Sequence, residues 1–227
     1  TGAGSGGGRL CGERMKRMNP VDLKLYLVTD SGYYDEKRFL DMVEQACRGG
    51  VTLLQLREKN RGGRDYLRLA QAVKEITDPF HVPLIIDDRV DVALACGAAG
   101  AHVGQTDLPV WAARKLMGPD KIVGATAKTV PQAREAYEQG ADYLGVGALF
   151  PTETKVNTVL TSIDTLKDIV KAVPIGVVGI GGLDESNVDI LTGSGAKGGA
   201  VVRAIVKAQD PERAARRLRD KLNTILK

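Results

Sequence analysis

The stretch KIVGATAKTVPQAREAYEQGADYLGVG, residues 121–147, decides the fold that this sequence predicts. It begins with the aliphatic run KIVGAT (121–126) and ends with a second such run, DYLGVG (142–147). In the polar stretch between them, apolar residues recur every three or four positions and a glycine ends the pattern, which is typical of an amphipathic helix. Two short apolar strands joined by a helix indicate a parallel pair covered on both faces. This stretch is therefore a strand–helix–strand unit.

The same unit recurs along the chain in both directions. The predicted strands are LYLVTD (25–30), TLLQLR (52–57), PLIID (83–87), GAHVG (100–104), KIVGAT (121–126), DYLGVG (142–147), IGVVGI (175–180) and GGAVV (198–202). Helical stretches lie between strands, among them EKRFLDMVEQACRGG, GRDYLRLAQAVKEIT and DESNVDILTGSG. Eight such repeats predict an α/β fold of the (β/α)8, or TIM-barrel, type. A doubly wound sheet is disfavoured, because VTDSGYY after the first strand is not a dinucleotide-binding glycine turn.

Length and the first residues indicate how the chain is organised. The 227 residues suffice for one large α/β domain, which we expect over residues 21–227 as a single catalytic barrel. Residues 1–20 are glycine-rich and lack periodicity, so we expect a disordered segment or linker there. Such a segment would be a cloning remnant or the seam of a fusion protein.

Charge and cysteine content exclude several functional classes. The formal net charge is +4, and no stripe of Lys and Arg of the kind that binds nucleic acid is present, so a small anionic ligand is expected instead. No apolar run is long enough to span a membrane, and no signal-peptide core is present. The three cysteines, Cys11, Cys47 and Cys96, have neither zinc-site nor disulfide spacing, which favours a reducing, cytoplasmic setting.

Polar residues occupy alternate positions where the second predicted strand ends. In a barrel of this type the active site lies at the carboxyl ends of the strands. Gln55, Arg57 and Lys59 are spaced by two, which directs their side chains to the same side. Two cations and an amide pointing together suit a phosphate or pyrophosphate. The alternative is a surface charge cluster with incidental spacing.

Carboxylates follow the third and fourth predicted strands. Asp87 and Asp88 end the third, and Asp107 follows the fourth. Because neighbouring strands end side by side, Asp88 and Asp107 are expected to face each other, and such oxygen ligands suit Mg²⁺. The alternative is that these residues cap helix N-termini. His102, inside the fourth strand, is predicted to be a packed or rim residue rather than a catalyst.

The later strand ends offer groups that bind anions. The candidates are Thr152, Thr154 and Lys155 after the sixth strand, Gly181 and Gly182 after the seventh, and Val202 and Arg203 after the eighth. Hydroxyls, a cation and glycine turns that expose backbone N–H groups suit phosphate, which barrels of this type often bind after their last two strands. The alternatives are ordinary turn chemistry and a tight turn that needs glycine.

Four motifs in this order make the chain resemble the thiamine phosphate synthase family. They are LQLREK, DDRVDVALACGAAGAHVGQTDLP, GADYLGVGALFPTETK and GVVGIGGLDESN. The resemblance covers about residues 24 to 225. It implies a transferase of thiamine biosynthesis that joins 4-amino-2-methyl-5-hydroxymethylpyrimidine diphosphate to 4-methyl-5-(2-phosphoethyl)thiazole. The products are thiamine phosphate and pyrophosphate, formed through a dissociative, carbocation-like mechanism.

The resemblance also implies a role for each matching residue. Asp88 and Asp107 would hold Mg²⁺, while Arg57, Lys59 and Lys155 would bind the diphosphate. The pyrimidine would contact Gln55, and Thr126 stands where the family has a serine that contacts the pyrimidine side or the diphosphate. Asp87 stands where the family usually has asparagine, and Arg203 replaces a serine. The thiazole phosphate would be bound by Thr152, Thr154, Gly182, Val202 and Arg203.

Three other functions remain open from the sequence. The related thiazole tautomerase uses a histidine near the position of Lys128, which disfavours it here. A lysine-dependent phosphosugar aldolase would use Lys59 or Lys155 as a Schiff-base nucleophile. A non-catalytic sensor of thiamine phosphate would have less need of a metal pair. The partners expected are the two small phosphorylated substrates, with a homo-oligomer or a fusion to another thiamine-pathway enzyme left open.

Overall fold

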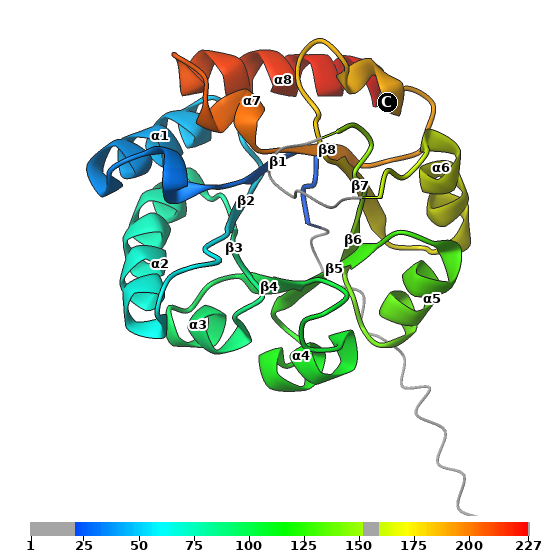
Figure 1. The fold of residues 1–227 in the computed structure, drawn as a ribbon, viewed down its shortest axis with the longest axis horizontal. Helices are drawn as coiled ribbons and strands as arrows, with labels where there is room; N and C mark the ends of the chain where they lie inside the picture. The colour runs from blue at the N-terminus through cyan, green and yellow to red at the C-terminus, as the bar shows by residue number, and fades with distance from the viewer. Residues whose placement is uncertain (1–20, 152–158, 227) are drawn as a thin grey trace, which may run out of the picture.

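Eight parallel strands form a closed barrel in chain order in the computed structural model, which describes residues 21–151 and 159–226. The strands are β1 (Leu25–Val28), β2 (Leu53–Leu56), β3 (Leu84–Asp87), β4 (Gly100–Val103), β5 (Ile122–Ala127), β6 (Tyr143–Val146), β7 (Gly176–Ile180) and β8 (Gly198–Val201). Figure 1 shows these strands as a ring with the helices outside it. The predicted (β/α)8 barrel is confirmed. The segment predicted to be disordered, residues 1–20, lies outside the described residues.

Helices cover the outer face of the ring. They are α1 (Glu36–Arg48), α2 (Gly63–Thr77), α3 (Val90–Ala95), α4 (Val110–Met117), α5 (Val130–Glu138), α6 (Ile163–Ala172), α7 (Arg203–Val206) and α8 (Pro211–Ile225), with 3-10 turns η1 (Ser31–Tyr33), η2 (Asp78–Phe80) and η3 (Val188–Leu191). Several begin at side-chain caps of the expected type, such as Asp35 on α1 and Ser162 on α6. The last helix, α8, packs against α1 and closes the outer layer. None of the described helices meets the length and apolarity that a membrane span requires.

Alternation along each strand separates two cores. Leu25 and Leu27 point outward into the large cluster between strands and helices, whereas Tyr26 and Val28 belong to the smaller cluster inside the barrel. Because a strand turns successive side chains to opposite faces, residues on both faces of a covered parallel sheet are apolar. This explains why the strands are near-continuous aliphatic runs in a chain with only 4% aromatic residues.

Two tyrosines fill the barrel interior. The rings of Tyr26 and Tyr143 meet edge to face, with centroids 5.6 Å apart. Gly124, the register partner of Tyr143 on β5, leaves room for this ring, since a Cβ there would lie 2.1 Å from Tyr143 Cζ. The glycine in KIVGAT therefore permits a large side chain on the neighbouring strand.

The segment between β7 and β8 corrects one prediction. The stretch DESNVDILTGSG was expected to be helical, but among its residues only η3 (Val188–Leu191) forms, as a 3-10 turn. Side chains at the start of the segment bond to the backbone instead: the Asp184 N–H donates to Asn187 Oδ1 at 2.9 Å and the Ser186 N–H to Asp184 Oδ1 at 2.8 Å. Such local bonds compete with the helical ladder, which explains the difference.

Candidate active site

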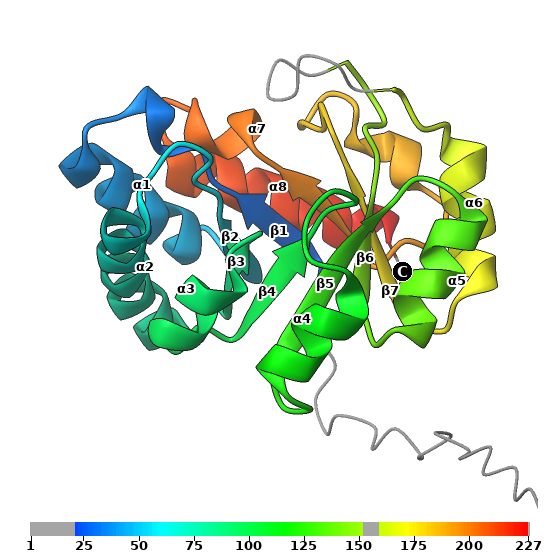
Figure 2. The same cartoon turned by 60° about the horizontal axis from the view of Figure 1, so that its bottom comes forward.

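A cavity of about 970 Å³ lies at the carboxyl end of the barrel. All eight strands or the loops that directly follow them contribute to its lining, from Val28 on β1 to Val202 after β8. In Figure 2 the short helix α7, which follows β8, lies near the upper rim of the barrel. The position of the cavity agrees with the expectation that the active site lies where the strands end.

Most of the predicted site residues meet in this cavity. Those that line it are Gln55, Arg57, Lys59, Asp87, Asp88, Asp107, Thr126, Gly182, Val202 and Arg203. The other three candidates, Thr152, Thr154 and Lys155, lie outside the described residues. Lys128 and Lys207 also line the cavity and add positive charge to its wall.

Charged side chains at the end of β3 and in the loops after β2, β3 and β4 form one side of the cavity. We call this side the charged rim (Arg57, Lys59, Asp87, Asp88 and Asp107). The Lys59 ammonium lies 3.0 Å from Asp87 Oδ2 and also contacts Asp88 Oδ2. Arg57 Nε is 3.7 Å from Asp87 Oδ2. The two adjacent carboxylates at the end of the third strand are therefore compensated, in this structure, by Lys59 and Arg57 from the end of the neighbouring strand.

The backbone at Asp88 explains how both carboxylates reach one cavity. In an extended chain, consecutive side chains point to opposite faces. Asp88 has φ of 61°, in the left-handed region, and its N–H donates to the carbonyl of His102 at 2.9 Å. The chain therefore turns at Asp88, so that its side chain joins that of Asp87. Helix capping does not account for either residue, because α3 has Arg89 at its N-cap and no side-chain cap within the described residues.

The side chains of Asp88 and Asp107 lie close enough to affect each other's pKa, and the strand order predicted that they face each other. Burial and the interaction with Asp88 raise the pKa of Asp107. Burial acts to raise the pKa of Asp88 as well, but its interactions with Asp107 and Lys59 outweigh this and lower it. Two carboxylates this close bind one shared proton or one cation. Their oxygen ligands therefore fit a hard divalent ion that takes one or two carboxylates and completes its shell with water and phosphate.

The carboxylate of Asp87 lies deeper than that of Asp88. Its side chain is 9% exposed, against 23% for Asp88. Burial first, and then the charge of Asp88, raises the pKa of Asp87, while Lys59 and Arg57 act in the opposite direction. The deeper carboxylate thus depends on its cations for compensation.

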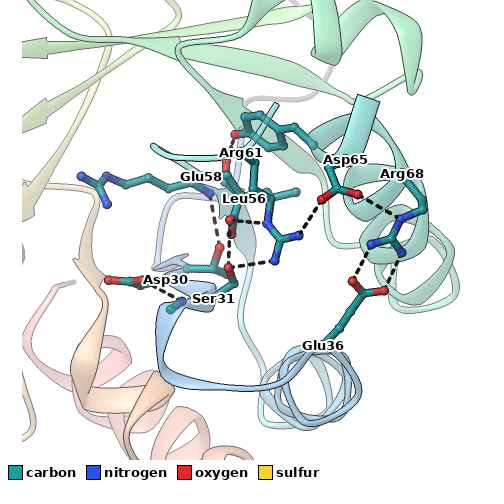
Figure 3. A network of polar contacts seen from close by, with 12 residues as sticks. Asp30, Ser31, Glu36, Leu56, Glu58, Arg61, Asp65 and Arg68 are labelled. Carbon is teal, nitrogen blue, oxygen red and sulfur yellow. Dashed lines mark hydrogen bonds and ion pairs between the residues drawn. The ribbon is translucent and has the colours of Figure 1, made fainter. Parts of the chain in front are cut away.

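A second polar network fixes the loop after β2 from outside the cavity (Figure 3). Glu58 Oε2 accepts from Ser31 Oγ at 2.8 Å and from Arg61 Nε at 2.7 Å. Arg68 forms a bidentate pair with Glu36, at 2.6 Å for each bond. Within this loop Glu58 faces η1, whereas the residues on either side of it line the cavity. The loop is therefore held on both faces.

Glycines after β7 form the opposite side of the cavity, which we call the glycine rim (Gly181 and Gly182). Their φ values are 99° and 66°, in the region that favours glycine. A Cβ on Gly182 would lie 2.7 Å from Phe150 Cβ and 2.9 Å from the Pro151 carbonyl oxygen. Both glycines line the cavity and present only backbone to it, which suits the close approach of a phosphate.

The sequence did not predict the polar contacts inside the barrel. His102, predicted to be a packed or rim residue, is buried and has Nε2 at 3.0 Å from Thr126 Oγ1 and Nδ1 at 3.1 Å from the Tyr143 hydroxyl. Tyr26 also lines the cavity and contacts Gln55. The signal was available, because strand alternation places Tyr26, His102 and Tyr143 at inward positions.

This architecture defines a class: a (β/α)8 enzyme whose cavity has cations and a carboxylate pair on one rim and exposed backbone on the other. The family model described as thiamine monophosphate synthase matches residues 25–205. The chain belongs to that family, so the predicted family and fold are confirmed.

Relatives and solved structures agree with this assignment. Thiamine-phosphate synthase 2 of Streptococcus pneumoniae is 54% identical over 92% of this chain and 100% of its own length. Thiamine-phosphate synthase of Lacticaseibacillus paracasei is 50% identical over 92% of this chain and 98% of its own. The structure of thiamine phosphate pyrophosphorylase from Pyrococcus furiosus superposes with a TM-score of 0.83 at 35% identity, covering 91% of this chain and 98% of that one.

One more distant structure shares the fold alone. The 3-hexulose-6-phosphate synthase of Salmonella typhimurium has a TM-score of 0.70 at 19% identity, covering 89% of this chain and 99% of that one. At such low identity the likeness says nothing about the reaction. The predicted transferase class therefore rests on the closer relatives, which are themselves synthases of thiamine phosphate.

Proposed function

We propose that this chain joins 4-amino-2-methyl-5-hydroxymethylpyrimidine diphosphate to 4-methyl-5-(2-phosphoethyl)thiazole, with Mg²⁺, releasing pyrophosphate. The observation that carries the proposal is the meeting of Lys59, Asp88 and Asp107 opposite the glycine rim in one cavity. A cavity of about 970 Å³ is large enough for two small phosphorylated ligands. The names and high identity of the relatives support the same reaction.

The charged rim is proposed to bind the diphosphate. Arg57 and Lys59 would contact its oxygens, with Lys155 as a further cation. Asp88 and Asp107 would hold Mg²⁺, which would neutralise the diphosphate and favour its departure. On binding, the Lys59 ammonium would exchange part of its contact with the carboxylates for contact with the diphosphate. Asp87 would remain as the buried counter-charge that orients Lys59 and Arg57.

The proposed reaction begins when the bond between the pyrimidine methylene carbon and the diphosphate oxygen breaks. The electron pair leaves with the oxygen, and the positive charge is delocalised into the aminopyrimidine. The thiazole nitrogen then donates its lone pair to that carbon and forms the new C–N bond. No proton has to be removed from this nitrogen, so the residues needed are those that stabilise the leaving group, with Arg57, Lys59, Thr126 and Lys155 in that role.

The glycine rim and the start of α7 are proposed to bind the thiazole phosphate. Gly182 offers backbone that no side chain covers, and Val202 and Arg203 line the cavity beside it. Thr152 and Thr154 would add hydroxyls from the preceding loop. Arg203 supplies a cation that suits a dianion. Gln55 and Thr126, on the floor between the two rims, would contact the pyrimidine.

All three alternatives lose support from the geometry. An aldolase lysine must be neutral to attack a carbonyl, but the pKa of Lys59 is raised: burial lowers it, and the contacts with Asp88 and Asp87 outweigh that effect. The described residues of the cavity also retain the full carboxylate pair, for which a tautomerase or a sensor has no use. A cytoplasmic setting, a homo-oligomer and a fusion remain predictions from the sequence.

The decisive experiment measures pyrophosphate release and thiamine phosphate formation with both substrates, with and without Mg²⁺. Asp88→Asn is the test variant, because asparagine tolerates the left-handed backbone at this position while losing the charge. We expect the rate constant kcat to fall by about 100-fold or more, as for other lost electrostatic contacts. Asp91→Asn, on the solvent side of α3, is the control and should retain wild-type turnover. Metal-independent turnover, or an Asp88→Asn variant as active as wild type, would overturn the proposal.

A further inference from the structure

A continuous chain of hydrogen bonds crosses the floor of the cavity from β2 to β5. Gln55 Nε2 lies 2.6 Å from the Tyr26 hydroxyl, which lies 2.6 Å from the Tyr143 hydroxyl. The Tyr143 hydroxyl lies 3.1 Å from His102 Nδ1, and His102 Nε2 lies 3.0 Å from Thr126 Oγ1. Both ends of the chain, Gln55 and Thr126, line the cavity.

The two tyrosines limit how the protons of this chain can be arranged. Burial raises the pKa of both phenols above the ordinary value, so each keeps its single proton at neutral pH. Gln55 Nε2 donates to the Tyr26 hydroxyl. The two contacts that follow fit a donor at either atom, and an order that continues in the same direction has Tyr26 donating to Tyr143 and Tyr143 donating to His102 Nδ1.

The order reaches Thr126 through the imidazole. A neutral imidazole that accepts at Nδ1 carries its proton on Nε2. Its Nε2–H then donates to Thr126 Oγ1, and the threonine hydroxyl keeps its own proton for another acceptor. In the opposite order, the Thr126 hydroxyl would donate its proton to His102 Nε2. It could then only accept a hydrogen bond from a ligand.

We propose that the chain Tyr26–Tyr143–His102 is a positioning device that holds Thr126 as an obligate hydrogen-bond donor toward the ligand in the cavity. His102 acts as the neutral Nε2–H tautomer, and the two tyrosines fix that tautomer from the other side of the barrel. The matching ligand presents an acceptor at Thr126, either a ring nitrogen or an oxygen of the leaving diphosphate. The identity of the ligand in this inference rests on the proposed function, whereas the tautomer of His102 does not.

The tautomer is tested first, in the wild-type protein without ligand. The sequence contains only two histidines, His81 and His102, so a ¹⁵N-labelled sample gives a simple imidazole spectrum. Since His81 is exposed, it serves as the internal reference for a ring that averages over tautomers. We expect His102 to show a protonated Nε2 and an unprotonated Nδ1. A protonated Nδ1, alone or together with Nε2, would overturn the proposal.

The kinetic test asks whether Tyr143 acts through Thr126. Tyr143→Phe removes the donor to His102, and Thr126→Val removes the hydroxyl with little change in volume. We expect each single variant to lower kcat/KM for the pyrimidine diphosphate about tenfold, the scale of one lost hydrogen bond, and to leave KM for the thiazole phosphate unchanged. In the Thr126→Val background, Tyr143→Phe should cost less than about twofold, because coupled residues are not additive. Independent, multiplicative losses would contradict the coupling.

Two controls separate the possible failures. Thr126→Ser retains the hydroxyl and should recover most of the activity lost in Thr126→Val, because its donor is the same. A wild-type protein that shows the expected tautomer but no turnover would refute the proposed function and leave the proton order intact. Thermal unfolding of Tyr143→Phe checks that its loss of activity does not come from unfolding. If the Nε2–H signal of His102 is unchanged in this variant, Tyr143 does not position the imidazole.

Discussion

The charged rim and the glycine rim face each other across one cavity, but they present opposite kinds of group to it. The charged rim uses side chains whose charges compensate one another, as Lys59 does with Asp87 and Asp88. The glycine rim has no side chains, so Gly181 and Gly182 line the cavity with backbone alone. Substitutions should therefore act through charge on the first rim and through volume on the second.

The largest contrast is expected from the removal of a charge at Lys59. Lys59→Gln keeps most of the side-chain length but leaves the carboxylates of Asp87 and Asp88 without their closest cation. We expect kcat/KM for the pyrimidine diphosphate to fall by about 100-fold, because a partly desolvated charge contact with the ligand is lost. Steady-state kinetics with each substrate varied in turn would measure the change.

The matched control for this variant is Lys167→Gln. Lys167 has a side-chain exposure of 39%, close to the 40% of Lys59, and pairs with Asp164 on the outside of α6. Its loss should leave kinetics unchanged. A Lys59→Gln variant with the kinetics of the control would show that the charged rim does not bind the diphosphate.

A smaller effect, confined to the other substrate, is expected at the glycine rim. Gly182→Ala introduces a Cβ against Phe150 and Pro151 and places a side chain on a backbone with φ of 66°. We expect KM for the thiazole phosphate to rise by about tenfold and the free energy of unfolding to fall by about 1–2 kcal/mol from the left-handed backbone alone. Kinetics and chemical denaturation measure the two effects separately.

Gly193→Ala separates strain from obstruction. Gly193 has φ of 67°, but a Cβ added there would have nothing within 4 Å, and the residue does not line the cavity. Its alanine variant should lose only the part of the free energy of unfolding that comes from the left-handed backbone, about 1–2 kcal/mol, and keep wild-type kinetics. Equal kinetic losses in both variants would mean that strain, and not the blocked backbone, impairs the glycine rim.

The smallest effect is expected behind the charged rim. Glu58→Gln weakens the bonds from Ser31 and Arg61 on the outer face of the loop, while the residues that line the cavity are untouched. We expect the free energy of unfolding to fall by about 1 kcal/mol and kcat/KM to change less than about threefold. Asp65→Asn, at the exposed end of the same network, should change neither quantity measurably. A kinetic loss at Glu58 as large as at Lys59 would show that the two faces of the loop are not separable.

The main residues of both rims could be predicted from the sequence. Alternation by two placed Gln55, Arg57 and Lys59 on one side, and strand order placed Asp88 beside Asp107. Both are consequences of backbone geometry that any sequence must obey. The glycine turn after the seventh strand was likewise predictable, since few residues other than glycine adopt a left-handed backbone.

The remainder depended on contacts between strands distant in the sequence. Tyr26 and Tyr143 are 117 positions apart, and only the closed barrel brings their hydroxyls to 2.6 Å. The helix predicted between β7 and β8 failed for a local reason, because Asp184 and Asn187 satisfy backbone groups that a helix would have used. Side-chain competition of this kind has a weaker signature than apolar periodicity.

The left-handed backbone at Asp88 limits what evolution or a designer can place there. Apart from glycine, asparagine, aspartate and histidine enter this conformation most readily, and of these only aspartate offers a hard cation a full negative charge. The left-handed backbone and the binding of a hard cation thus favour aspartate independently of each other. An attempt to introduce a cysteine thiolate at this position for a softer metal would first have to rebuild the turn. If the site binds the hard cation that we propose, that preference depends on the main chain as well as on the side chains.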